Sequence, residues 1–320
     1  RTCTKGHSIA IDACCVFDYD STKNLRLTSQ SRVTMLSRRV LAYARNGHRL
    51  CATKMAAQVL RGQSTTTTTA LEGYSGSSAR EKFKLNPCTG RRQSPIELST
   101  PRRSEKLQRA RADLRMHRYD GPFSQYKVKD TEFGVKVRVL GGLQPSLKGT
   151  GLPGRFLLHN LHFHAGLDDS CGSEHTMDGK TFAMEAHFVH YNDQFSSLEE
   201  ASMERDGLAV IAVFFKLSYD KCPDTLHTII SAMDSPEKSK DTPLFLSQML
   251  PGIPPTSYFL YSGSLTLPPY TENVTWMVCT QTLDVTSEAL ARFRDSASAN
   301  SKGNIRPTQP IGDRKVILCS

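Results

Sequence analysis

The sequence has no long hydrophobic run, no CxxC cysteine pair and no internal repeat. Its longest nearly apolar stretch covers residues 207–215, far short of the ~18 residues that a membrane-spanning helix needs. The nine cysteines include no CxxC pair, so a zinc ribbon has no support. The absence of a repeat excludes collagen and coiled coils. What remains is a globular composition, in which 22% of the residues are charged.

Acidic residues are missing from one long segment. Residues 21–71 contain no Asp or Glu, while arginine recurs along them, and residues 1–70 carry +8 of the total net charge of +10. An Arg-rich, Ser-containing, acid-free segment is typical of a mitochondrial transit peptide, and a disordered extension is the alternative. We therefore expect residues 1–70 to be a targeting or disordered extension and residues 71–320 to be the folded domain. A mitochondrial location is favoured, with a secreted or a cytoplasmic location as alternatives.

The folded part is close to neutral. Residues 71–320 carry a net charge of only +2, so we expect no nucleic acid as a partner of this part. The Arg-rich stretch 102–118 is interrupted by Glu105 and Asp113 and has no interleaved aromatic residue. It is therefore interpreted as a solvated loop or helix face.

From about residue 72 the pattern changes to short apolar alternations broken by glycine and proline. Alternation with period two predicts strands, and the candidates are Phe133–Leu140, Phe156–Phe163, Ala183–Tyr191, Leu208–Leu217 and Thr275–Cys279. Helical candidates are fewer: Ser197–Met203, Leu226–Met233 and Ser287–Phe293, the last with Ser287 as its expected N-cap. The predicted fold class is mainly β with peripheral helices (α+β).

Three histidines fall on the predicted strands in a pattern that suits a metal ion. His162 and His164 are two residues apart, which puts both imidazoles on one face of a strand. His187 lies on another alternating strand, where Glu185 shares its face. Three imidazoles that converge from neighbouring strands leave the fourth position of a tetrahedral zinc site open for water, as catalytic zinc requires. Glu185, and Asn160 beside His162, are placed to accept the second N–H of a ligand and orient its ring.

Histidines on strands also have a less specific interpretation, in which they bind no metal. Histidines on strands are more often satisfied or exposed polar residues than metal ligands, and His159, His175 and His190 are interpreted in that way. A cupin would also use an H-x-H pair with a later histidine, but the glutamate close to that pair and the second Gly-Pro motif are not found.

Several separated motifs resemble those of the alpha-class carbonic anhydrases, in the expected order from about residue 72 to residue 320. Besides the two histidine strands, the similar segments are Gln93–Ile96 (QSPI), Gly172–Thr176 (GSEHT), Tyr261–Thr266 (YSGSLT), Pro268-Pro269 and Asn304–Pro310 (NIRPTQP). The resemblance implies a large central, mostly antiparallel twisted sheet with a conical zinc site. It also implies a zinc-dependent enzyme that hydrates CO2 reversibly to bicarbonate and a proton, a reaction that serves pH regulation. We expect a monomer.

The resemblance also implies roles for individual residues. Zn²⁺ would be bound by His162, His164 and His187, and the hydroxyl of Thr266 would accept a hydrogen bond from zinc-bound hydroxide and donate one to Glu174. CO2 would lie in an apolar pocket. The five pocket positions all remain apolar here: Val189, Val210, Leu265, Val274 and Trp276. Attack of the hydroxide on CO2 gives bicarbonate, and a proton must then reach solvent; no organic cofactor is implied.

Several positions depart from the pattern of that family, and one of them bears directly on the mechanism. Where its fast members carry a histidine that shuttles protons, this chain has Phe133, next to Glu132, and phenylalanine cannot carry a proton. The sequence therefore predicts an enzyme without a histidine shuttle. The alternative function is that of a carbonic-anhydrase-like zinc domain with little turnover that acts as a binding or matrix protein. A basic nucleic-acid-binding protein is a more distant third.

Overall fold

The computed structural model describes residues 9–11, 15–19, 25–27, 90–100, 108–131, 133–149, 151–235, 242–296 and 303–320. The chain divides into two compact units, Arg1–Thr65 and Thr66–Ser320. In the first unit, three short strands form an antiparallel sheet in the order β1-β2-β3. They are β1 (Ile9–Ile11), β2 (Cys15–Tyr19) and β3 (Leu25–Leu27).

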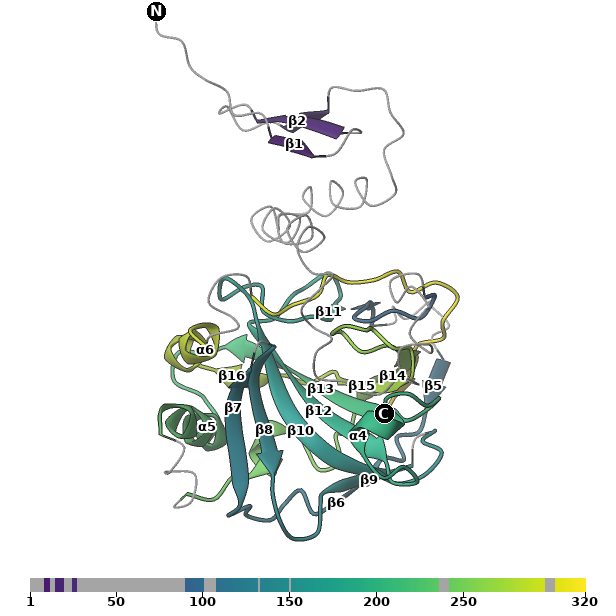
Figure 1. Cartoon of the computed structure of the whole chain (residues 1–320), viewed down its shortest axis with the longest axis vertical. Coiled ribbons are helices and arrows are strands. Elements are labelled where there is room, and N and C mark those ends of the chain that lie inside the picture. Colours follow the sequence, from purple (N-terminus) through teal and green to yellow (C-terminus); the bar gives the residue numbers. More distant parts are fainter. Residues whose placement is uncertain are drawn as a thin grey trace, which may run out of the picture. The chain divides into compact units, whose positions relative to one another are not determined.

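A large twisted sheet dominates the second unit (Figure 1). Its strands follow the order β5-β17-β14-β15-β13-β12-β10-β8-β7, with β16 beside β13 and with β9 joining β6 to β10. These strands are β5 (Gln108–Ala110), β6 (Arg115–His117), β7 (Tyr126–Thr131), β8 (Gly134–Val139), β9 (Ser146–Lys148), β10 (Phe156–Ala165), β12 (Met184–Asn192), β13 (Leu208–Leu217), β14 (Tyr258–Gly263), β15 (Val274–Cys279), β16 (Leu283–Val285) and β17 (Ile317–Cys319). A separate parallel pair joins β4 (Glu97–Leu98) to β11 (Thr176–Met177).

The predicted fold class is confirmed. Most neighbouring strands of the large sheet are antiparallel, while β13 pairs in parallel with β15 and β16, and β17 with β5. The five strands predicted from alternation correspond to β8, β10, β12, β13 and β15. The interpretation of residues 102–118 as a loop or helix face was wrong for two segments, because β5 pairs with β17 and β6 with β9. Such long-range pairing leaves no local signal in an Arg-rich stretch.

The helices among the described residues are few and short. They are α4 (Leu198–Ala201), α5 (Asp224–Asp234), the 3-10 helix η3 (Leu246–Met249) and α6 (Ser287–Arg294). The expected N-cap of α6 was wrong by one residue: Thr286 has extended backbone and its side chain accepts from the Ala289 N–H, whereas the Ser287 hydroxyl donates to Asp169. No helix within the described residues has the length and apolar character needed to cross a bilayer.

The large sheet presents two different faces. On β10, Phe163 points to the face where α5 and α6 lie together (Figure 1), and its ring lies 4.6 Å from that of Phe293 in α6. Because neighbouring residues of a strand point to opposite faces, His162 and His164 point the other way. Helices α5 and α6 therefore lie on one face of the sheet, whereas α4 and the polar residues singled out above lie on the other.

Candidate metal centre

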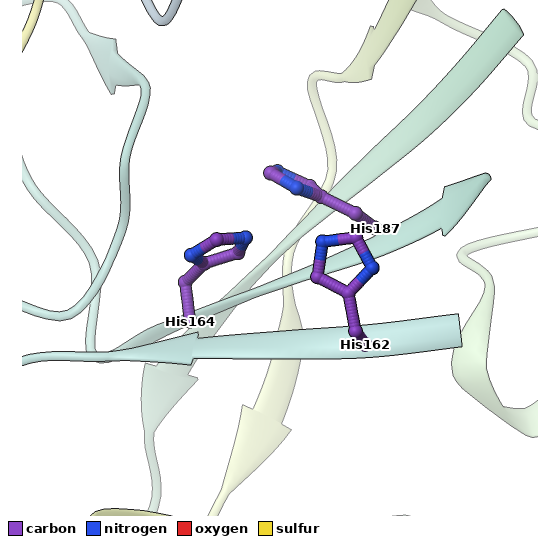
Figure 2. A group of neighbouring side chains, drawn as sticks. All are labelled: His162, His164 and His187. Carbon is purple, nitrogen blue, oxygen red and sulfur yellow. The ribbon is translucent and has the colours of Figure 1, made fainter. Parts of the chain in front are cut away.

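His162, His164 and His187, here called the histidine triad, converge from two adjacent strands (Figure 2). β10 and β12 are antiparallel, and His162 lies directly opposite His187 in their register. The ring centroids are 5.1 Å apart for His162 and His164, 5.2 Å for His162 and His187, and 4.4 Å for His164 and His187. One nitrogen from each ring lies within 4.8 Å of the other two. The three side chains thus form a group that is able to hold one metal ion.

Each ring of the triad has one nitrogen engaged by the protein. His162 Nδ1 donates to Asn160 Oδ1 (2.9 Å), His164 Nδ1 to the Asn304 carbonyl (2.7 Å), and His187 Nε2 to Glu185 Oε1 (2.6 Å). The opposite nitrogen of each ring remains for a metal. His164 Nε2 is buried and has no hydrogen-bond partner, which is costly for a polar atom unless something binds it. The donor set therefore fits a zinc ion with three imidazole ligands.

Burial favours the neutral form of two of the triad's three rings. It holds the pKa of His162 well below its usual value, with further lowering from His164, His187 and Lys136. It lowers the pKa of His187 to about 4, although the Glu185 carboxylate opposes that shift. A metal ligand must be the neutral imidazole, so these two rings are ready to bind a metal at neutral pH.

Glu185 is the hub of a buried hydrogen-bond network. Its Oε2 accepts from the backbone N–H groups of Glu174 and His175 (2.8 Å each), and its Oε1 accepts from His175 Nδ1 (2.7 Å) and from His187. Burial alone would raise its pKa, but His175 and His187 hold the pKa of Glu185 well below the usual range. The charged form is therefore fixed beneath the metal centre.

The network continues away from the triad. His175 Nε2 lies 2.7 Å from the Tyr261 hydroxyl, which in turn lies 2.9 Å from the Ser94 hydroxyl. His175, Glu185 and His187 also lie within metal-binding distance of one another, but their close atoms are already hydrogen-bonded together. Sequence reasoning interpreted His175 as a satisfied polar residue and did not connect it to the triad. Its place in GSEHT, one residue after Glu174, was the only local signal.

Glu174 and Thr266 lie beside the triad. Glu174 is buried, its Oε1 accepts from the Arg306 N–H (2.9 Å), and its Oε2 lies 3.5 Å from His164 Nε2. Burial raises the pKa of Glu174, while His164, the Thr266 hydroxyl and the Arg306 N–H act against that shift. The structure thus brings together the two residues for which the family resemblance implied a hydroxyl–carboxylate pair.

The five expected pocket residues share one apolar cluster on the triad's face of the sheet. Val189, Val210, Val274 and Trp276 are buried in it, and Leu265 packs against it. The Trp276 ring lies 4.9 Å from that of His187 and donates its N–H to the Ser264 carbonyl (3.0 Å). An apolar wall therefore borders the histidine triad.

Phe133 lies immediately before β8 and is 37% exposed. Its carbonyl accepts from Asn304 Nδ2 (2.8 Å), and the same Asn304 supplies the carbonyl that holds His164. Its neighbour Glu132, the other residue considered for proton transfer, lies outside the described residues. Asn304 was missed as a partner of the triad because 140 residues separate it from His164, and no local pattern joins them.

Two further basic residues lie on the triad's side of the sheet. Lys136 lies directly opposite His162 in the β8–β10 register. A β-bulge lies between Leu158 and Asn160, and it brings His159 Nδ1 within 2.9 Å of Asn160 Nδ2. Burial and Arg138 lower the pKa of His159 to about 4. Period-two reasoning did not assign a role to these residues.

Most of the chain is similar in sequence to known carbonic anhydrases. The family model for eukaryotic-type carbonic anhydrases matches residues 78–320. Carbonic anhydrase 1 of Oryctolagus cuniculus is 33% identical over 241 residues, which cover 71% of this chain and 98% of that protein. Carbonic anhydrase 3 of Homo sapiens is 34% identical over 181 residues, covering 53% of this chain and 68% of that protein. The region matched by the family model contains every residue of the metal centre.

Proposed function

The chain belongs to the eukaryotic-type carbonic anhydrase family and is a carbonic anhydrase enzyme, and on this premise we propose how its own residues carry out CO2 hydration. The histidine triad would hold one zinc ion. The observation that supports this best is that each ring has its second nitrogen fixed, by Asn160, Asn304 or Glu185, so that three nitrogens remain on one side. When bound, zinc lowers the pKa of a water ligand to about 7, which supplies hydroxide near neutral pH.

Thr266 and Glu174 would orient the nucleophile. Glu174 accepts a hydrogen bond from the Arg306 N–H, and its carboxylate accepts a second one from the Thr266 hydroxyl. A hydroxyl that already donates has only lone pairs left for its other neighbours. The Thr266 hydroxyl would therefore act as an acceptor toward a zinc-bound hydroxide and would orient it for attack, which is the positioning effect that catalysis needs.

The apolar wall would hold CO2. Val189, Val210 and Trp276 offer no hydrogen bond to water in this region, apart from the Trp276 N–H, which is already taken by Ser264. CO2 has no net charge or dipole, so it enters such a wall at little cost, whereas water there would lose hydrogen bonds. Bicarbonate is charged and would leave the wall readily.

Proton export would depend on solvent buffer. Phe133 occupies the position that the family pattern gives to a histidine shuttle, and it has no titratable group. The chemical step governs kcat/KM, while the proton step can limit kcat. We therefore infer that kcat rises with added small imidazole buffers while kcat/KM stays constant.

The test is a stopped-flow CO2 hydration assay combined with metal analysis on the full chain. We expect one zinc per chain, and we expect His164→Ala to lose both zinc and activity. His227→Ala is the control, because His227 is exposed on α5. A chain that binds one zinc but does not hydrate CO2 would contradict the proposal and point to the binding or matrix function instead.

A further inference from the structure

Four cations lie together on β7 and β8. In the register of these antiparallel strands Lys127 lies directly opposite Arg138, and Lys129 directly opposite Lys136. Side chains that are directly opposite share a face and stand only about 5 Å apart at Cβ, so like charges there repel each other and destabilise the sheet. Two such pairs in succession form what we call the basic ladder.

The basic ladder lies on the same face as the histidine triad. Lys136 is also directly opposite His162 of β10, while its neighbours Val135 and Val137 are buried in the apolar core on the other face. Lys136 is partly buried, and Lys127, Lys129 and Arg138 are exposed. Positive charge therefore extends from the metal centre, across β8, to the outer strand of the sheet.

Among the described residues, no carboxylate forms an ion pair with the inner end of the ladder, Lys136 and Arg138. Glu199 of α4 acts electrostatically on Arg138 and His159, whereas Lys136 is influenced by its own burial and by Arg138 and by no carboxylate. Asp130 of β7 lies opposite Val135, so it points to the core side of the sheet. A partly buried ammonium without a counter-ion is an unfavourable arrangement that an anionic ligand would relieve.

Protection of a sheet edge explains only the two outer cations of the ladder. Lysines on edge strands block unwanted strand pairing, and β7 is at the end of the strand order, so that reason applies to Lys127 and Lys129. It does not apply to β8, which lies between β10 and β7. Lys136 and Arg138 need another explanation.

We propose that Lys136 and Arg138 form an anion subsite on the wall of the metal centre, which binds small oxyanions of the size of bicarbonate, with Lys127 and Lys129 extending its field outward. The ligand's identity as bicarbonate rests on the proposed function, whereas the subsite itself rests on the strand register. A cluster of charges of one sign concentrates ions of the opposite sign near it. The subsite would retain the anionic product and make the enzyme sensitive to competing anions.

The test measures nitrate binding to the zinc-loaded full chain at constant ionic strength. Stabilisation against thermal unfolding gives a dissociation constant without reference to activity, and inhibition of CO2 hydration gives a second one. In the double variant Lys136→Gln/Arg138→Gln we expect both constants to rise by at least about fivefold, because two nearby charges are removed. The single variant Lys136→Arg keeps the charge and should bind nitrate with the affinity of wild type. The control is Lys315→Gln, which removes an exposed charge next to β17, near the opposite end of the strand order.

The outcomes separate this proposal from the proposed function. Equal nitrate affinity in wild type and the double variant would overturn the subsite. If the double variant does not fold, Arg138→Gln alone replaces it, since Arg138 is exposed, and a rise in the dissociation constant is again required. A chain that binds nitrate through Lys136 but does not hydrate CO2 would keep the subsite and refute the proposed function.

Discussion

Glu185 shows how a single buried residue can determine the metal centre. It accepts four hydrogen bonds, two from backbone N–H groups and two from imidazoles, and both of its oxygens are used. Only a carboxylate offers two acceptor atoms in this geometry, since an amide replaces one of them by a donor. The orientation of His187 depends on this match.

We expect Glu185→Gln to weaken zinc binding by about 10- to 100-fold, the usual effect of losing a partner that orients a metal ligand. The amide NH2 would face N–H donors in a buried site and leave them unsatisfied. Competition with a chelator measures the affinity. Glu272→Gln serves as control because Glu272 bonds Arg92 and Gln93 and no member of the triad. Unchanged zinc affinity in Glu185→Gln would contradict the positioning role.

Phe133→His should raise kcat in dilute buffer by about tenfold, because a histidine with a pKa near 6.5 exchanges protons at working pH. It should also reduce the dependence of kcat on added imidazole, and it should leave zinc content unchanged because Phe133 is not part of the triad. The matched control is Phe133→Leu, which changes shape without adding a titratable group. Wild type with high kcat and no buffer dependence would show that another group carries the proton.

The sequence could indicate the triad but not the residues that fix its rings. His162 and His164 share a face because of a period of two, which is a local property of any strand. Asn304 and Tyr261 reach the network across 140 and 86 residues, and their contacts depend on how distant segments pack. Long-range contacts of this kind leave no periodic pattern, so only the family motifs hinted at them.

At the scale of elements, the bulge in β10 shows the same limit. Alternation predicts a regular strand from Phe156 to Phe163, and β10 does cover those residues. The register shift between Leu158 and Asn160 inserts one residue, and bulges of this kind re-aim side chains near active sites. The prediction for His162 and His164 was unaffected because both follow the bulge. His159 lies in the bulge itself, so the alternation of the sequence could not predict which way its side chain points.

The start of α6 provides a test of the corrected cap. Thr286→Ala should lower the free energy of unfolding by about 1 kcal/mol, because the Thr286 side chain accepts from the Ala289 N–H at the first turn. Ser287→Ala should cost less, since the Ser287 hydroxyl bonds Asp169 at the surface instead. Urea unfolding of both variants measures the difference. A larger loss for Ser287→Ala would restore Ser287 as the cap.

At the scale of the whole molecule, the large sheet packs its core on one face and carries the residues of the metal centre on the other. One face packs under α5 and α6 through residues such as Phe163 and Phe293. The other face carries the triad, the apolar wall and the basic ladder. Because adjacent residues of β10 serve the two faces alternately, a shift of its register by one residue would exchange them. The packed core therefore also fixes the register that assembles the site.

The remaining question at this scale is whether the first unit contributes to activity. The family model begins at residue 78, and the second compact unit begins at Thr66. Most of the net positive charge belongs to residues 1–70. We therefore propose that residues 1–70 are an extension without a catalytic role. Deleting them should leave kcat/KM within about twofold of the full chain, because removing a segment outside a domain leaves its packing intact.

Stopped-flow CO2 hydration and zinc analysis of the truncated chain measure this, with a thermal unfolding curve to establish that it folds. His164→Ala in the same truncated chain provides the inactive reference, so that a small residual rate is not mistaken for activity. A truncated chain that folds cooperatively and holds one zinc, yet loses hydration activity, would mean that the first unit helps to complete the site. The domain boundary would then lie before residue 70, and the positive charge of the first unit would have to be counted with the basic ladder in any account of anion binding.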